Sequence, residues 1–183
     1  MRRPAKLSRE MNRVEGGTLV LTLLALTLAC QKPLSINQPK GTPEMIAKRE
    51  CVADLLMQGG PFQVLHRVSD IPAEVRPVFR KSEGFDAGAD MAEPGAPFQS
   101  SDITDPAAPM ILHRLRSVAL SKSTCFVFYQ VGGFGRGEVV AVFKRIDRDA
   151  TVLLWHAQLL RAVEDPADLL AAMQNGEFRD PNP

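Results

Sequence analysis

The residue types that could carry chemistry in this chain are few, and their spacing does not assemble a reactive site. The three histidines are His66, His113 and His156. None has a second His, Cys, Asp or Glu at the spacing of a helical metal motif such as HExxH, and a zinc site needs three or four converging ligands. We therefore expect ordinary strand histidines and no bound metal, although a sheet could bring His113 and His156 together.

The cysteines give no sign of a nucleophile. Cys125 lies between apolar residues, where burial is expected to raise the pKa of its thiol rather than lower it. No neighbouring base is evident that would activate it, and the chain has no Gly-x-Ser-x-Gly sequence. No cofactor is predicted. A pair of carboxylates that meets only in space would be invisible in the sequence, so a hydrolase stays an alternative.

A glycine-rich segment at 132–137 has some similarity to a phosphate-binding loop. Such a loop is followed by the N-terminus of a helix, whose free N–H groups hold the phosphate. Here the residues from Glu138 to Ala141 have the composition of a strand. We therefore predict a hairpin turn, in which Phe134 and Arg136 are exposed and available for contact with a partner.

Charge is nearly balanced over the chain but uneven along it. The 183 residues include 22 Lys and Arg against 21 Asp and Glu, a net charge of +1, which gives no reason to expect a nucleic-acid partner. Basic residues dominate before residue 16, and an uncharged apolar run follows up to Cys30. This run is shorter than the roughly 20 residues of a spanning helix. The pattern is typical of an export signal peptide that starts at Met1 or Met11.

The sequence Thr27-Leu28-Ala29-Cys30 resembles the signal of bacterial lipoprotein precursors. In that family the cysteine is acylated and becomes the first residue of the mature protein. The usual pattern has Leu three positions before the cysteine and a small residue two positions before it, where this chain has Thr27 and Leu28. Two alternatives are cleavage after Ala29 without lipid, which would give a soluble periplasmic or secreted protein, and an uncleaved anchor.

The resemblance implies removal of residues 1–29 and acylation of Cys30, with residues 30–41 as a Pro-containing tether. Acyl chains would hold the protein in the lipid bilayer, since each buried CH₂ adds about 0.8 kcal/mol of membrane affinity. Gln31 after the cysteine resembles, in enteric-type sorting, an outer-membrane address facing the periplasm. The mature part resembles only small exported bacterial proteins of unknown function.

Acylation of Cys30 would leave Cys51 and Cys125 as an even pair in an oxidising compartment. A disulfide between them would close a loop of about 75 residues and contribute at most roughly 4 kcal/mol of stability. The alternative is two buried free thiols that pack as small apolar side chains. We expect the disulfide.

Two helices and four strands are expected to position these residues. Thr42 and Pro43 predict the start of a helix that ends at Gly59, and Asp165 and Pro166 predict another that ends at 175–176. Residues 110–120, 124–131, 138–146 and 151–156 predict strands joined by short turns. The predicted fold class is α+β, a four-stranded antiparallel meander with an N-terminal and a C-terminal helix packed on one face.

The other segments have weaker patterns. Residues 62–68 favour a short strand, and a short helical piece is expected after Pro72, ended by Pro77. Residues 82–109 are rich in Pro, Gly and Asp and predict a flexible insertion. Residues 177–183 predict a frayed tail. The chain is therefore expected to hold a single α+β domain at 42–176.

These patterns favour a non-enzymatic function. We expect a lipid-anchored module that binds another protein of the bacterial cell envelope, with an immunity-type inhibitor of a delivered toxin as one variant. The signal sequence, the tether and the lack of a recognisable catalytic pattern favour this interpretation. The alternatives are an exported hydrolase and a small-ligand-binding protein, because either site could be formed only by the fold.

Overall fold

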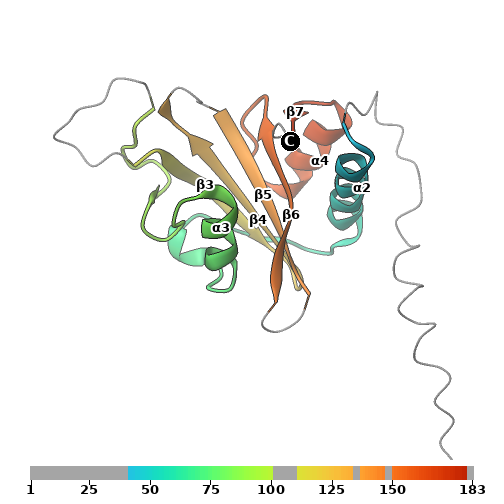
Figure 1. The fold of residues 1–183 in the computed structure, drawn as a ribbon, viewed down its shortest axis with the longest axis horizontal. Helices are drawn as coiled ribbons and strands as arrows, with labels where there is room; N and C mark the ends of the chain where they lie inside the picture. The colour runs from blue at the N-terminus through green and yellow to red at the C-terminus, as the bar shows by residue number, and fades with distance from the viewer. Residues whose placement is uncertain (1–40, 101–110, 134–136, 147–149, 181–183) are drawn as a thin grey trace, which may run out of the picture. The chain divides into compact units, whose positions relative to one another are not determined.

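A mostly antiparallel sheet forms the centre of the fold (Figure 1). The computed structural model describes residues 41–100, 111–133, 137–146 and 150–180. Four long strands follow one another and pair antiparallel with their neighbours. They are β3 (His113–Leu120), β4 (Thr124–Val131), β5 (Gly137–Arg145) and β6 (Thr151–Leu159). The α+β class and the consecutive pairing of these strands are therefore as predicted.

Three short strands make the sheet larger than the predicted four-stranded meander. β1 (Gln63–Leu65) pairs antiparallel with β3, and β2 (Met91–Ala92) pairs parallel with β3. β7 (Phe178–Arg179) pairs antiparallel with the end of β6. Among the described residues the sheet therefore has seven strands, more than the predicted four-stranded meander. β1 lies within the short strand expected at 62–68, whereas β2 and β7 were not predicted because strands of two residues leave no periodic pattern.

Side-chain caps start the first and last helices where the sequence predicts them. α2 (Pro43–Gln58) begins after Thr42, whose hydroxyl accepts a hydrogen bond from the backbone N–H of Met45 at 3.3 Å. α4 (Pro166–Gln174) begins after Asp165, whose carboxylate accepts from the N–H of Asp168 at 2.8 Å. In both helices Pro occupies the first position, where a missing N–H costs nothing.

A third helix, α3 (Val75–Glu83), differs from the expectation that Pro77 would end the helical piece. Pro77 is instead the third residue of the helix. The N–H groups of the first turn have no partner within a helix, so a proline there removes no hydrogen bond. The helix follows a short 3₁₀ turn, η1 (Val68–Asp70), and ends at Gly84, which has a φ of 77°.

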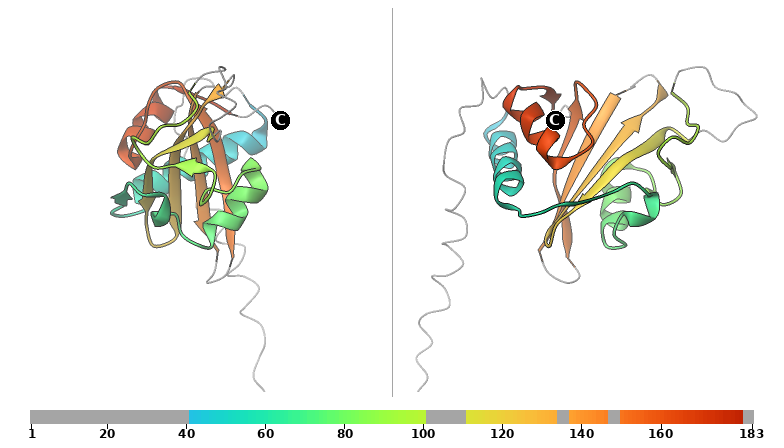
Figure 2. Two further views of the ribbon diagram at one scale, coloured as in Figure 1. Left: turned by 90° about the vertical axis from the view of Figure 1, so that its left-hand side faces the viewer. Right: turned by 180° about the vertical axis from the view of Figure 1, so that it is seen from behind.

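The helices cover both faces of the sheet (Figure 2). α2 and α4 pack on one face through Val52, Leu169 and Met173, against strand residues such as Phe126 and Phe128. η1 and α3 pack on the other face. Apolar residues are therefore buried on both sides of β4 and β5, and these strands are nearly continuously buried rather than alternating.

Two segments expected to be loose are packed where the structure describes them. In the predicted insertion at 82–109, Ala87, Met91 and Ala92 are buried, and β2 joins the sheet; residues 101–110 lie outside the described residues. In the predicted tail at 177–183, Phe178 packs edge-on against Trp155 with ring centroids 5.6 Å apart. Scattered apolar residues can thus anchor a chain segment without forming a periodic pattern.

Cys51 and Cys125 are both free thiols, so the expected disulfide is not formed in this structure. Cys51 belongs to α2, the helix that packs on the face containing Phe126. Cys125 belongs to the core on the opposite face, with Val127 and Tyr129. Neighbouring residues of a strand point to opposite faces, and the sheet therefore separates the Cys125 side chain from α2.

Candidate functional site: a groove along the edge of β6

β6 has one open edge. β5 pairs with β6 along its length, whereas β7 pairs with the other edge only at Gln158 and Leu159. From Thr151 to Ala157, no strand within the described ranges lies against that other edge, which we call the open edge. Val152 on β6 is 39% exposed. Such an edge presents unpaired backbone N–H and C=O groups.

A groove of about 530 Å³ runs along the open edge. It is lined by four consecutive β6 residues, 153–156, by the start of α2 and by the end of α3. Leu154 is the extra residue of a β-bulge, and it packs with Trp155 on the α2 face of the sheet, whereas Leu153 and His156 lie on the α3 face. A cavity that touches residues on both faces lies at the edge of the strand. The groove therefore extends from the α2 side of the sheet to the α3 side, within the size range of ligand sites.

Three polar side chains from separate elements meet beside the groove. The phenol of Tyr129 on β4 donates to Glu83 Oε2 at 3.1 Å and lies 3.4 Å from His156 Nε2. The same His156 nitrogen lies 3.4 Å from Glu83 Oε2. The side chains of Glu83 and His156 are only 11% and 25% exposed. The end of α3 thus holds a carboxylate over the sheet, supported by a tyrosine.

Burial sets the protonation of this cluster. Burial lowers the pKa of His156, and the nearby Glu83 carboxylate opposes this only in part, so the imidazole is neutral at neutral pH. Burial and the adjacent carboxylate raise the pKa of Tyr129 well above its ordinary value, so the phenol keeps its proton and acts as a donor. Neither partner brings a positive charge to Glu83.

The other carboxylates that line the groove are already paired with cations. Glu44 forms an ion pair with Lys48 at 2.7 Å, and Asp180 pairs with Arg49. No Lys or Arg ion pair to Glu83 is present in the described part of the chain. Glu83 is therefore the carboxylate of the groove that lacks a cation, which makes this part of the groove suited to a positively charged ligand group.

The cluster is better suited to binding than to nucleophilic catalysis. Ser82 also lines the groove, but its hydroxyl donates to the Phe79 carbonyl at 3.2 Å. Within the described ranges, no group of three His, Cys, Asp or Glu side chains could hold a metal ion. Glu83 and His156 remain a carboxylate and an imidazole that could exchange a proton with a bound molecule.

The other two histidines lie apart from this cluster. His113 on β3 stacks on Phe85 with ring centroids 3.6 Å apart, and burial lowers its pKa more than Asp90 raises it. β4 and β5 separate β3 from β6, so Tyr129 lies between His113 and His156 rather than the two meeting directly. His66 Nδ1 lies 3.2 Å from the Arg116 carbonyl oxygen.

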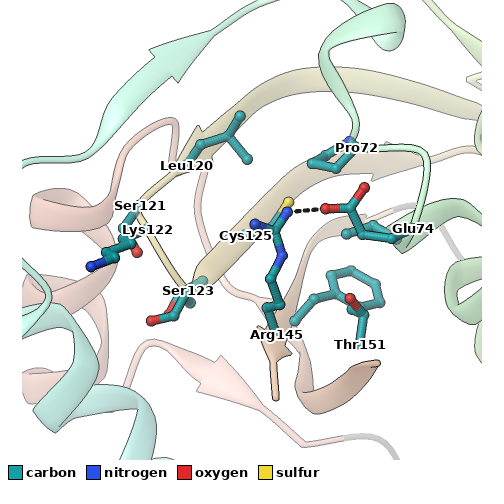
Figure 3. Close-up of a pocket in the computed structure, with 12 residues that line it drawn as sticks. Pro72, Glu74, Leu120, Ser121, Lys122, Ser123, Cys125, Arg145 and Thr151 are labelled. Atoms are coloured by element: carbon teal, nitrogen blue, oxygen red, sulfur yellow. Dashed lines mark hydrogen bonds and ion pairs between the residues drawn. The ribbon is translucent and has the colours of Figure 1, made fainter. Parts of the chain in front are cut away.

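Cys125 borders a second, smaller cavity of about 80 Å³ (Figure 3). An ion pair between Arg145 and Glu74 spans it. Burial raises the pKa of the Cys125 thiol to about 12, so it carries almost no thiolate near neutral pH. As its apolar neighbours predict, Cys125 is a poor nucleophile.

The remaining predicted site residues, Cys30, Phe134 and Arg136, lie outside the described residues. Glu83 and Tyr129 were not among the predicted site residues, and His156 was expected to be an ordinary strand residue. One signal was available, because Tyr129 is the only tyrosine of the chain and lies within an apolar strand, where a buried hydroxyl needs a hydrogen-bond partner. Its partners are 46 and 27 residues away, and spacing does not identify them.

Comparisons with protein-family models, with curated proteins and with solved structures find no match to this chain. None of the helices within the described ranges combines the length and hydrophobicity needed to cross a bilayer.

Proposed function

We propose that this chain is a lipid-anchored protein of the bacterial cell envelope whose folded domain binds another protein. Acylated Cys30 would hold it in the bilayer, at the outer membrane facing the periplasm. The alternative is a soluble periplasmic or secreted form cleaved after Ala29. The sequence from Thr27 to Cys30 and the basic segment before it support the anchor.

The groove along the open edge of β6 is the observation that carries the binding role. Proteins usually cover or shorten exposed strand edges, because such edges pair readily with other chains. Here the edge extends from 151 to 157 with one β-bulge at Leu154, and two helices border it without filling the space beside it. An edge of this kind suits recognition of a partner protein.

The mass of the protein isolated from its native membrane fraction tests the anchor. We expect a chain that starts at Cys30 and carries acyl groups. Replacement Cys30→Ser should remove the acyl mass and release the protein from the membrane fraction, whereas Cys51→Ser should change neither. A full-length, unmodified chain in the wild-type sample would contradict the proposed anchor.

Site-specific photocrosslinking tests the binding role. A benzoylphenylalanine at Val152, on the open edge, should capture one envelope protein in intact cells. The control position is Met57, which is 47% exposed near the end of α2 and does not line the groove. The same capture at both positions, or none at Val152, would argue against binding at this groove.

A hydrolase or a small-ligand-binding protein is the second candidate, because the groove gathers Glu83 and His156 in a concave site. Hydrolysis of an ester or peptide panel that is lost in His156→Gln would favour the enzyme. Thermal stabilisation by a small metabolite would favour the carrier. Neither effect is expected from a module that binds protein.

A further inference from the structure

The form and charge of the groove indicate which kind of protein segment fits it. We propose that the partner adds an extended segment to the open edge of β6 as a further strand, and that a Lys or Arg of this segment lies over Glu83. This inference deepens the proposed function, since it rests on the existence of a protein partner.

The backbone of β6 can pair with an added strand. Residues 151–157 have an edge that no other described strand occupies, and extended peptides bind such edges through main-chain hydrogen bonds. Leu153, Leu154, Trp155 and His156 all border the groove, so the space beside this edge follows the strand. An added strand would fill it with its backbone directed at β6.

The two walls of the groove differ in chemistry, and an added strand would present a side chain to each. Successive residues of an added strand point alternately to the α2 side and the α3 side of the sheet. Met45 of α2 lines the groove on one side, and Glu83 of α3 lines it on the other. An apolar residue toward Met45 followed by a basic residue toward Glu83 would match both walls.

Charge complementarity selects the basic residue. The Glu83 side chain is 11% exposed and accepts a hydrogen bond from the neutral Tyr129 phenol. Its other ionisable neighbour is His156, which burial keeps neutral. A Lys or Arg would form a charge-assisted hydrogen bond in a largely desolvated place. An acidic residue there would be repelled, and a neutral one would leave the carboxylate without a counter-charge.

A second copy of this chain fits the groove less well. In edge-to-edge pairing, the segment from Thr151 to Ala157 of one copy would lie against the same segment of the other. That segment contains no Lys or Arg. Self-association along this edge therefore supplies no cation to Glu83 through the paired strands, and a different protein is the better occupant.

Binding of synthetic peptides to the purified full-length chain tests the proposal. The probe is a peptide of alternating Thr and Val with one central Lys, and the matched peptides carry Gln or Glu at the centre. Trp155 is the only tryptophan and lines the groove, so its fluorescence reports occupancy. We expect the Lys peptide to bind about tenfold or more tightly than the Gln peptide.

Two further comparisons separate the charge from the strand. Glu83→Gln should remove the preference for Lys, whereas Glu164→Gln, a 62% exposed carboxylate outside the groove, should preserve it. N-methylation of every second peptide residue removes backbone donors and should abolish binding. If Glu83→Gln fails to fold, the three peptides on the wild-type chain still decide the role of charge.

Several results would overturn the proposal. Equal binding of the Lys and Gln peptides would show that Glu83 does not select a basic residue. Unimpaired binding of the N-methylated peptide would show that the peptide does not pair with β6 as a strand. An equal response to lysine amide alone would indicate a small amine site. Dimerisation abolished by Val152→Lys would assign the edge to a second copy. None of these measurements needs the lipid or the native partner, so their failure is distinguishable from failure of the proposed function.

Discussion

Arg49 of α2 forms a buried ion pair with Asp180, the residue that follows β7. Their side chains are only 7% and 5% exposed. Trp155 Nε1 donates to Asp180 Oδ1 at 3.0 Å, and the Arg49 guanidinium carbon lies 4.9 Å from the centroid of the Phe178 ring. The pair thus joins the first described helix to the last described strand, through a strand of the sheet.

Asp180→Ala should destabilise the domain strongly. The substitution removes the Asp180 carboxylate from a buried ion pair, and breaking a buried pair by removing one partner costs about 3–5 kcal/mol. Urea unfolding followed by circular dichroism measures the loss. The control is Glu44→Ala, which breaks an exposed pair with Lys48 on α2 and should change the free energy of unfolding far less, because solvent screens exposed ion pairs. Similar losses in both variants would contradict the structural role of the Arg49–Asp180 pair.

Stability should fall as the pH falls below about 6.5, the ordinary pKa of histidine. Burial lowers the pKa values of His113 and His156 in the folded state. Below pH 6.5 these two histidines therefore bind protons in the unfolded chain but not in the folded chain, and unfolding becomes more favourable. Above that pH this protonation of the unfolded chain does not occur, and the domain keeps its full stability. Thermal unfolding between about pH 7.5 and 5.5 should show the decline.

Replacement His156→Gln should reduce the slope of this pH dependence, since it removes one of the two titrating groups. His66→Gln removes a histidine from an exposed position and serves as the control. A wild-type domain whose stability is flat or rises toward pH 5.5 would contradict the prediction, as would an unchanged slope in His156→Gln.

Gly132→Ala should destabilise the end of β4. A Cβ atom at this position would lie 1.6 Å from the backbone oxygen of Gln99, and a backbone atom cannot move aside cheaply. We expect a loss of about 1–3 kcal/mol. At Gly137 the new Cβ would meet only the end of the flexible Gln158 side chain, at 2.4 Å, so Gly137→Ala should cost clearly less. Equal unfolding midpoints for the two variants would contradict this close approach.

Cys51 and Cys125 should both be alkylated without reductant once the protein is denatured, because the sheet separates them. In the native protein, iodoacetamide near pH 8 should modify the half-buried Cys51 first. Cys125 should resist, since it is buried and its thiol has a pKa of about 12. Peptide mapping distinguishes the two sites. A Cys51–Cys125 disulfide recovered from native material would contradict the arrangement.

Capping residues in the sequence correctly predicted where two of the helices begin. The Thr42–Pro43 and Asp165–Pro166 pairs start helices because their side chains and ring act within one turn. The four long strands were predictable from β-branched composition and short turns. The prediction that Pro77 ends a helix was wrong, because proline breaks the interior of a helix but is harmless in its first turn.

The groove could not be predicted in this way. Glu83, Tyr129 and His156 meet only because α3 packs across the sheet and the register of β3 to β6 brings Tyr129 and His156 to one face. The burial of both faces of the sheet also results from long-range packing. It depends on α3, where the sequence favoured only a short helical segment that ended at Pro77. Long-range packing, not local propensity, forms the site.

The position of α2 has a mechanical consequence. Any pull transmitted along the chain ahead of Gly41 enters the folded domain at this helix. α2 is attached to the domain by side-chain packing and by the Arg49–Asp180 pair, whereas the strands of the sheet share a ladder of backbone hydrogen bonds. Under load, α2 would peel away before the sheet shears, and it would take with it one wall of the groove.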